Sequence, residues 1–143
     1  MNSGTYPLNL ARGITDSACV QGSGVTKCAY AFDKKLREDG RRELSIQWLD
    51  DRGAETEIKT RMREGEPMFT RGFAVLKTTD LDEMCRIYEY RGLCYERSAS
   101  KGNPYHGLII MNEVDSKLHR REIMSELALR SVFYPYSQEL PVG

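Results

Sequence analysis

The order of strand-like and helix-like segments is the feature that most constrains the fold of this chain. Strand character, meaning runs of β-branched and aromatic residues bounded by turn residues, is found in five segments: residues 25–32, 44–49, 68–77, 93–97 and 105–111. Helical character is found in three segments: residues 54–64, 79–92 and 116–132. Strands and helices therefore follow each other irregularly, whereas they alternate one by one in parallel α/β domains. The sequence predicts an α+β domain with a mainly antiparallel sheet of about five strands and about three helices packed on it.

Turn and cap residues refine this prediction. Asp39 and Gly40 lie between the first two strand segments, and an Asp-Gly pair tolerates the positive φ of a tight hairpin. We therefore expect residues 25–32 to pair with residues 44–49. Thr79 has a good N-cap side chain for the second helix, and Gly92 is expected to end that helix.

The chain has 143 residues, which is the length of one ordinary domain. Residues 1–24 show little periodicity and end in Gln-Gly-Ser-Gly, so we interpret them as a flexible N-terminal lead-in. A single α+β domain is expected over residues 25–132, followed by an exposed C-terminal tail over residues 133–143. The aromatic residues of this tail either fold back on the core or serve as a docking segment.

Charge and composition limit the compartment and the partners. The chain has 21 basic and 21 acidic residues, so its formal net charge is zero and nucleic acid is an unfavoured partner. No apolar run approaches the roughly 20 residues of a membrane span, and no secretion signal is visible. We therefore expect a cytoplasmic protein whose cysteines are reduced. The four cysteines lack metal-ligand spacing and no phosphate-binding glycine motif is present, so neither a metal nor a cofactor is expected.

A first group of candidate site residues lies on the strand segment 44–49. Alternation along this segment directs its apolar residues, including Trp48, to one face and Ser45 and Gln47 to the other. Asp50 follows at the strand end, so a hydroxyl, an amide and a carboxylate lie close together in sequence. A solvated outer face of the sheet explains the same pattern, and that alternative stays open.

A second candidate is His106, which lies where a turn enters a strand. Pro104 and Gly107 restrict the backbone on either side, and side chains at such junctions often lie at the rim of a sheet. The imidazole is either a general base or ligand-binding group, or a side chain whose nitrogens bond to turn backbone groups. If the two strands are neighbours, Ser45, Gln47 and His106 converge on one concave surface. Ser45 is then a candidate nucleophile for His106 to activate.

Three short segments resemble a set of small uncharacterised bacterial proteins. Residues 44–50, 72–76 and 103–109 are similar to the L-S-x-N-W-L-E, F-A-x-L and P-x-H-A-x-I motifs of those proteins. This chain has Gln47 in place of Asn, Asp50 in place of Glu and Gly107 in place of Ala, and we interpret all three differences as conservative. The resemblance implies a bacterial or phage cytosolic origin. It also implies that Trp48 and His106 belong to one site with the polar residues of the 44–50 segment, and it brings no established activity.

Two function classes remain. The first is a binding or regulatory protein that acts on a protein partner, possible also as a homo-oligomer, in a bacterial or phage defence, counter-defence or toxin-neutralising system. The balanced charge and the lack of catalytic motifs favour this class. The second is a small enzyme in which His106 is the general base and Ser45, Gln47 and Asp50 bind substrate. Nucleic-acid binding through the basic residues of 34–42 ranks last. The binding residues are expected to be Ser45, Gln47, Trp48, Asp50, Asn103, Tyr105 and His106.

Overall fold

The computed structural model describes residues 6–113 and 117–143. Over these residues the chain has three α-helices: α1 (Arg52–Thr60), α2 (Thr78–Ile87) and α3 (Lys117–Arg130). The main sheet has six strands: β1 (Asn9–Gly13), β4 (Arg41–Trp48), β7 (Phe73–Lys77), β8 (Cys94–Arg97), β9 (His106–Asn112) and β10 (Val132–Tyr134). Two ribbons are formed by β2 (Val20–Gln21) with β3 (Gly24–Val25) and by β5 (Met62–Arg63) with β6 (Glu66–Pro67). The 3₁₀ turns are η1 (Ser17–Cys19), η2 (Lys27–Tyr30) and η3 (Glu89–Arg91).

The main sheet is antiparallel throughout. Its strand order is β10-β7-β1-β4-β9-β8, and each neighbouring pair runs in opposite directions. The predicted α+β class is therefore confirmed, with six strands in place of about five. The longest pairing joins β4 to β9, and it brings Gln47 opposite His106.

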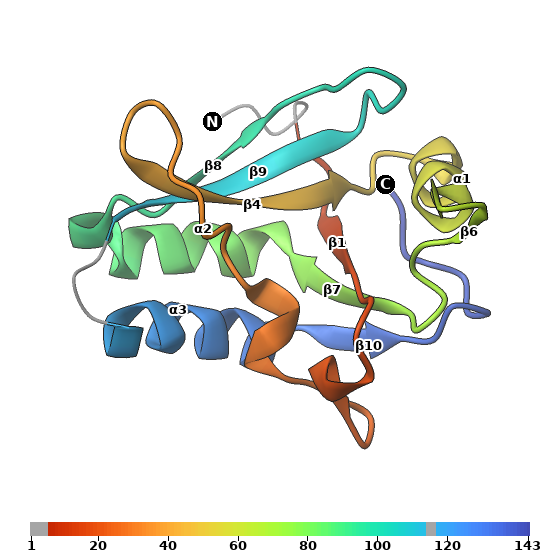
Figure 1. Cartoon of the computed structure of the whole chain (residues 1–143), viewed down its shortest axis with the longest axis horizontal. Coiled ribbons are helices and arrows are strands. Elements are labelled where there is room, and N and C mark those ends of the chain that lie inside the picture. The colour runs from red at the N-terminus through yellow and green to blue at the C-terminus, as the bar shows by residue number, and fades with distance from the viewer. Residues whose placement is uncertain (1–5, 114–116) are drawn as a thin grey trace.

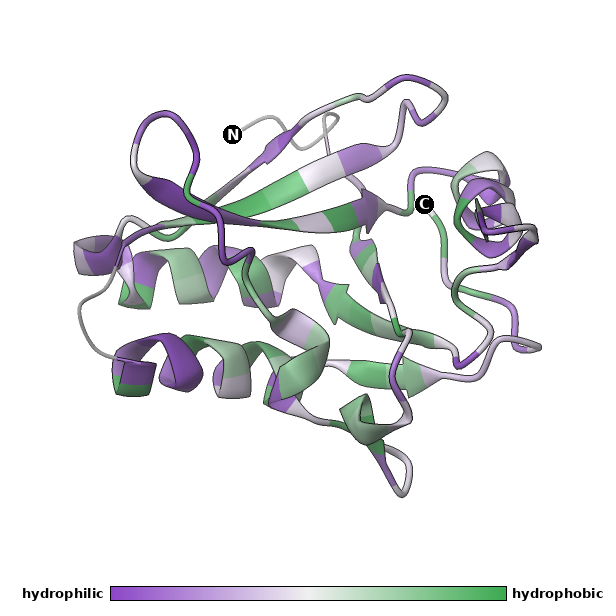
Figure 2. Ribbon diagram, in the orientation of Figure 1, coloured by the Kyte–Doolittle hydropathy of each residue, from purple (hydrophilic) through white to green (hydrophobic). Residues whose placement is uncertain are grey.

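The two faces of the sheet carry different layers. Helices α2 and α3 lie side by side on one face (Figure 1) and pack against alternate residues of β4, among them Ile46 and Trp48. Helix α1 and the C-terminal segment lie toward the other face, where Leu49, Ile58 and Leu140 belong to a second apolar cluster. In Figure 2 the central strands carry hydrophobic bands, whereas the loop that precedes β4 is mostly hydrophilic. The period-two pattern of β4 thus separates a helix-covered core from the face on which the candidate site lies.

The three helices lie close to their predicted positions, with differences at their ends. Helix α1 begins after Asp51, whose carboxylate accepts a hydrogen bond from the Ala54 N–H at 3.2 Å. The prediction that Thr79 caps α2 is wrong, because the N-cap position is Lys77. The prediction that Gly92 ends this helix is also wrong, because α2 ends at Ile87 with Tyr88 as its C-cap, and Gly92, with a φ of 67°, caps the η3 turn that follows.

The expected flexible lead-in and exposed tail are corrected by the structure. Strand β1 lies in the middle of the sheet between β7 and β4, and its Leu10 and Ala11 are fully buried. At the other end β10 pairs with β7, and Leu140 is buried. Periodicity failed to predict β1 because this short strand is covered on both faces, so its residues do not alternate between apolar and polar.

The hairpin expected between residues 25–32 and 44–49 does not form. Residues Lys27–Tyr30 make the η2 turn, and the neighbours of β4 are β1 and β9. The aromatic character of this segment has another cause, since the fully buried Tyr30 bonds through its hydroxyl to Ser131 at 2.5 Å. A tight turn is present where it was expected, with Gly40 at a φ of 78°.

The expectation of four reduced cysteines is also corrected. Cys19 and Cys28 form a disulfide that links η1 to η2, while Cys85 and Cys94 are free thiols. Burial raises the pKa of the Cys85 thiol to about 12. Within residues 6–113 and 117–143, none of the helices has the length and apolar character needed to cross a membrane.

Candidate functional site

A cavity of about 470 Å³ lies on the sheet face that α2 and α3 leave uncovered. Strands β1, β4 and β9 contribute its floor, and α1 with the chain that follows it contributes a wall. The residues that line it are Ala11, Arg12, Gly13, Thr15, Asp33, Ser45, Ile46, Gln47, Ile58, Arg61, Arg63, Met68, Phe69, Asn103 and His106. A volume of this size suits a small organic ligand, for which pockets of about 300–1,000 Å³ are usual.

Ser45 and His106 form a hydrogen-bonded pair in this cavity. The Ser45 Oγ lies 3.1 Å from Nε2 of His106, and Nδ1 of the same ring lies 2.7 Å from the backbone carbonyl of Ser98. A carbonyl oxygen only accepts, so Nδ1 carries the hydrogen of that bond. In the neutral imidazole Nε2 then has a free lone pair, and the Ser45 hydroxyl donates to it. This is the arrangement in which a histidine can remove a serine proton.

The register of β4 and β9 brings the pair together. Gln47 lies opposite His106 and Ser45 lies opposite Leu108, so Ser45 and His106 are diagonal neighbours on one face of the sheet. The Ser45 residue is exposed and His106 is half-buried, so both side chains are open to a ligand. The predicted convergence of Ser45, Gln47 and His106 is confirmed by this geometry.

The side chains of Gln47 and Asn103 are engaged in hydrogen bonds within the protein. The buried Gln47 amide donates to the Ala54 carbonyl and to Glu57, each at 3.1 Å, and it accepts from the Asn103 amide at 2.8 Å. The Asn103 oxygen accepts in turn from the Tyr105 N–H at 3.0 Å. These bonds connect β4, α1 and the turn before β9. Both amides therefore act as positioning groups for the site.

Arg12 lies where β1 separates from β4. Pairing of the two strands ends at Ala11 and Gln47, and beyond that point Arg12 donates to the Ser45 carbonyl at 2.8 Å and to the Ala29 carbonyl at 2.9 Å. Burial lowers the pKa of the guanidinium from its ordinary value, although arginine keeps its charge at neutral pH. A cation consequently adjoins the backbone of the candidate nucleophile.

Two further arginines line the cavity from the chain that follows α1. Arg61 forms an ion pair with Glu57 just beyond the end of α1. Arg63 is exposed on β5 and has no ion-pair partner within the described part of the chain. The sequence pattern did not indicate Arg12, Arg61 and Arg63 as site residues, because Arg12 lies in the segment expected to be a flexible lead-in and the other two lie in a predicted surface helix.

Three of the predicted binding residues lie outside the cavity. Trp48 is fully buried on the helix-covered face, and Asp50 forms a two-point ion pair with Arg97 at 2.5 and 2.9 Å. The hydroxyl of Tyr105 bonds to Asp51, which raises the pKa of that phenol. Asp50 is therefore committed to Arg97 and is not available for the substrate-binding role expected of it.

The described residues, 6–113 and 117–143, include no group of three or more metal-ligating side chains that could hold an ion. Comparison with known proteins found no matching family model, no matching curated protein and no matching solved structure. The cavity, its hydrogen bonds and its charges are therefore the features that bear on function.

Proposed function

We propose that the protein is a small enzyme that cleaves an ester, with Ser45 as the nucleophile and His106 as the general base. The observation that carries this proposal is the chain of bonds from the Ser98 carbonyl through His106 to the Ser45 Oγ at the edge of a cavity. It favours the enzyme hypothesis over the partner-binding role that the sequence ranks first.

The proposed reaction has two balanced steps. The Ser45 Oγ forms a bond to the electrophilic centre while its proton moves to Nε2 of His106, and the imidazolium then gives that proton to the leaving oxygen as the ester bond breaks. A water molecule then attacks the same centre and gives a proton to His106. The imidazolium returns that proton to the Ser45 Oγ as the bond to Ser45 breaks, and the acid is released. The Ser98 carbonyl accepts from Nδ1 throughout, which keeps the ring in the productive orientation.

Arg12 supports this role of Ser45. Its guanidinium donates to the backbone carbonyl of Ser45 at 2.8 Å, so a positive charge lies beside the residue that would attack the substrate, where it favours negative charge developing on that substrate. Fixed charges of this kind act strongly in a partly buried site, because they need no reorganisation during the reaction.

The proposal is tested with a fluorophosphonate probe and intact-mass spectrometry. The expected result is one adduct, with loss of fluoride, on the Ser45 Oγ. His106→Ala should lower the labelling rate about 10²–10⁴-fold, which is the usual contribution of a general base. Ser125→Ala, at an exposed serine of α3, is the matched control and should label like the parent protein. Absence of labelling, or labelling that does not depend on His106, would refute the proposal.

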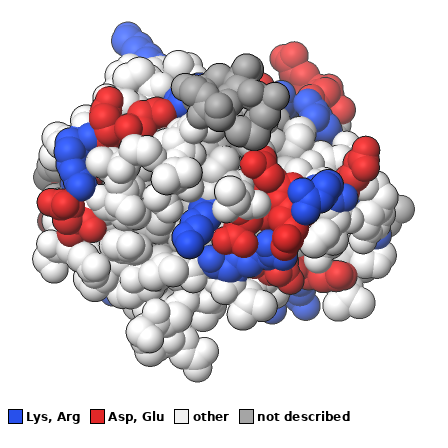
Figure 3. All heavy atoms as spheres, turned by 180° about the vertical axis from the view of Figure 1, so that it is seen from behind, with Lys and Arg blue, Asp and Glu red and all other residues white. Residues whose placement is uncertain are grey.

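The partner-binding role remains a separate prediction. The aromatic residues Phe133, Tyr134 and Tyr136 fold back on the two apolar clusters, so the docking alternative for the tail loses its motivation. On the face seen in Figure 3, acidic and basic side chains of the described residues are intermingled. Co-purification from the native host at moderate salt tests this role, and a stoichiometric protein partner would support it.

A further inference from the structure

We propose that the substrate of this cavity is an organic phosphate, held by Arg63 and Arg61 with Arg12 contributing charge. This inference rests on the proposed function, because it names the substrate class of the same site. It starts from the side chains that line the cavity, which include three arginines and one carboxylate, Asp33.

Basic side chains at the ribbon β5–β6 line the cavity, whereas its acidic side chains do not. Residues 61–66 contain two arginines and two glutamates, and Arg61 and Arg63 line the cavity whereas Glu64 and Glu66 do not. The turn that allows this arrangement has positive φ at Glu64 (53°) and at Gly65 (83°). The local sequence is neutral, yet the cavity wall that it forms is positive.

The donors of these arginines are largely available to a ligand. Arg63 has no ion pair within the described residues, and Arg61 uses Nη2 for Glu57. A guanidinium has five N–H donors in a planar fork, so Arg61 keeps donors beyond those used by this ion pair. The fork matches the oxygens of a phosphate group, which Arg binds in two-point fashion.

Charge and shape favour a phosphate ester over a carboxylate. The positive charge of the three arginines is offset by Asp33 and by Glu57, the ion-pair partner of Arg61. A phosphate monoester has three acceptor oxygens and about −1.5 to −2 charges at neutral pH, so it can accept from Arg61 and Arg63 together, whereas a carboxylate has two oxygens and a single charge. The apolar side chains Ile58, Met68 and Phe69 line the same cavity and suit the organic part of the molecule. The ligand class is therefore a phosphate ester with an apolar or aromatic group.

The test measures binding of phenyl phosphate to the Ser45→Ala variant by isothermal titration calorimetry. This variant lacks the proposed nucleophile, so binding is observed without turnover. Arg63→Gln in that background should weaken binding at least tenfold. Arg71→Gln is the matched control, because Arg71 is exposed and does not line this cavity, and it should leave the affinity unchanged. Phenylacetate should bind more weakly than phenyl phosphate.

The outcomes separate this inference from the proposed function. Failure of phenyl phosphate to bind, or equal affinity in the Arg63→Gln variant, overturns the inference even where Ser45 is labelled by the fluorophosphonate. Equal or tighter binding of phenylacetate overturns the phosphate assignment. Arg63-dependent binding of phenyl phosphate without labelling of Ser45 supports the phosphate site and refutes the nucleophile.

Discussion

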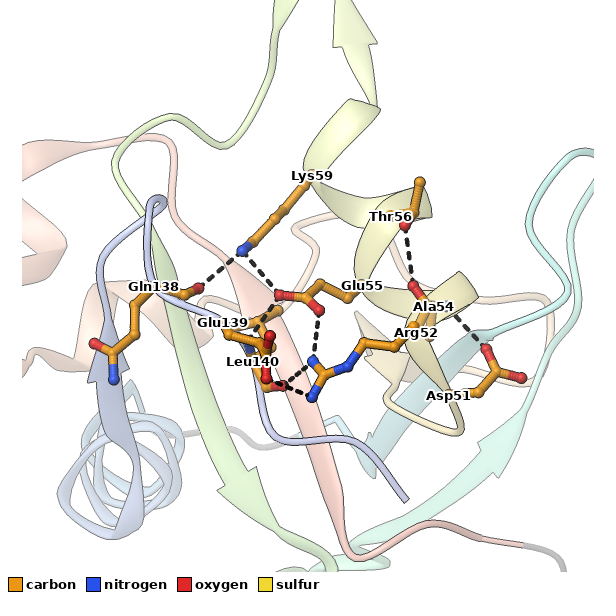
Figure 4. Close-up of polar contacts among 9 residues, drawn as sticks. All are labelled: Asp51, Arg52, Ala54, Glu55, Thr56, Lys59, Gln138, Glu139 and Leu140. Carbon is orange, nitrogen blue, oxygen red and sulfur yellow. Dashed lines mark hydrogen bonds and ion pairs between the residues drawn. The ribbon is translucent and has the colours of Figure 1, made fainter.

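Replacement of Glu55 by glutamine should weaken the attachment of the C-terminal segment to α1. Glu55 is 8% exposed and accepts three hydrogen bonds: from the Leu140 N–H at 2.8 Å, from Lys59 at 2.9 Å and from Arg52 at 2.6 Å (Figure 4). Lys59 and Arg52 also donate to carbonyls of the C-terminal segment, those of Gln138 and Leu140. One carboxylate therefore connects the helix, two cations and the returning chain.

The magnitude follows from which contacts the variant loses. An amide oxygen at this position can still accept from the Leu140 N–H, but its NH₂ group faces a donor and its charge is gone. Hydrogen bonds to charged groups contribute about 1.5–3 kcal/mol each when buried, and partial exposure of Arg52 reduces its share. We expect Glu55→Gln to lower the free energy of unfolding by about 2 kcal/mol, or the midpoint temperature by about 8 °C.

The stability difference between the parent protein and Glu55→Gln should depend on pH. Burial raises the pKa of the Glu55 carboxyl, but the bonds from Leu140, Lys59 and Arg52 outweigh burial, so its pKa lies below the ordinary 4.5. A depressed pKa in the folded state contributes stability above the unfolded pKa and loses it as pH falls through the folded pKa. The difference between parent and variant should therefore be full at pH 7 and shrink below about pH 4.5.

Chemical denaturation followed by circular dichroism, at pH 7 and at pH 3, measures both quantities. Glu139→Gln is the matched control, because Glu139 pairs with the same Arg52 but has a side chain 76% exposed. Glu139→Gln should lower the free energy of unfolding by less than about 0.5 kcal/mol. Equal effects of the two variants, or a Glu55→Gln effect that persists undiminished at pH 3, would refute the reasoning.

Three further predictions concern the scaffold. His106→Ala should cost about 1 kcal/mol or less in a thermal melt, because the ring is half-buried and contributes little to the core; a much larger loss would assign the ring a mainly structural role. Gly107→Ala should cost about 1–3 kcal/mol in the same assay, since a Cβ there would lie 2.3 Å from Nε1 of Trp48, and an unchanged melt would contradict this packing. Thiol titration in denaturant without reductant should find two free thiols, as the Cys19–Cys28 disulfide requires, and four would contradict the bond.

The parts of the fold that sequence predicted are those in which one face is apolar. In β4 the alternation of Ile46 and Trp48 with Ser45 and Gln47 encodes both the strand and its buried face, and that is enough to direct Ser45 to the face opposite the helices. The pairing of β4 with β9 is not encoded in this pattern. Helix α2 is equally legible, because Leu81 and Met84 repeat at helical spacing and both are fully buried.

The parts that sequence did not predict depend on contacts far along the chain. Arg12 lies in a segment with no periodic signal, and its importance comes from the Ser45 carbonyl 33 residues away. The approach of Cys19 to Cys28 likewise depends on how η1 and η2 pack, which spacing alone does not encode. The sequence alone indicates that Gly107 in place of Ala is conservative, because the two residues are similar in size. An alanine there would bring its Cβ to 2.3 Å from Nε1 of Trp48, so the replacement is not conservative in this fold.

Helix α1 contacts the C-terminal segment and also forms one wall of the cavity. Glu55 faces Leu140, whereas Glu57 of the same helix accepts from Gln47 and pairs with Arg61. The site therefore depends on α1 through two carboxylates that face in different directions. Gln47 also donates to the Ala54 carbonyl, and this second attachment holds α1 on the sheet when the tail contact is lost. We therefore expect the cavity wall to stay in place. Glu55→Gln should accordingly reduce stability while leaving the labelling rate of Ser45 at neutral pH unchanged, and a parallel fall in both would show that the tail itself positions the site.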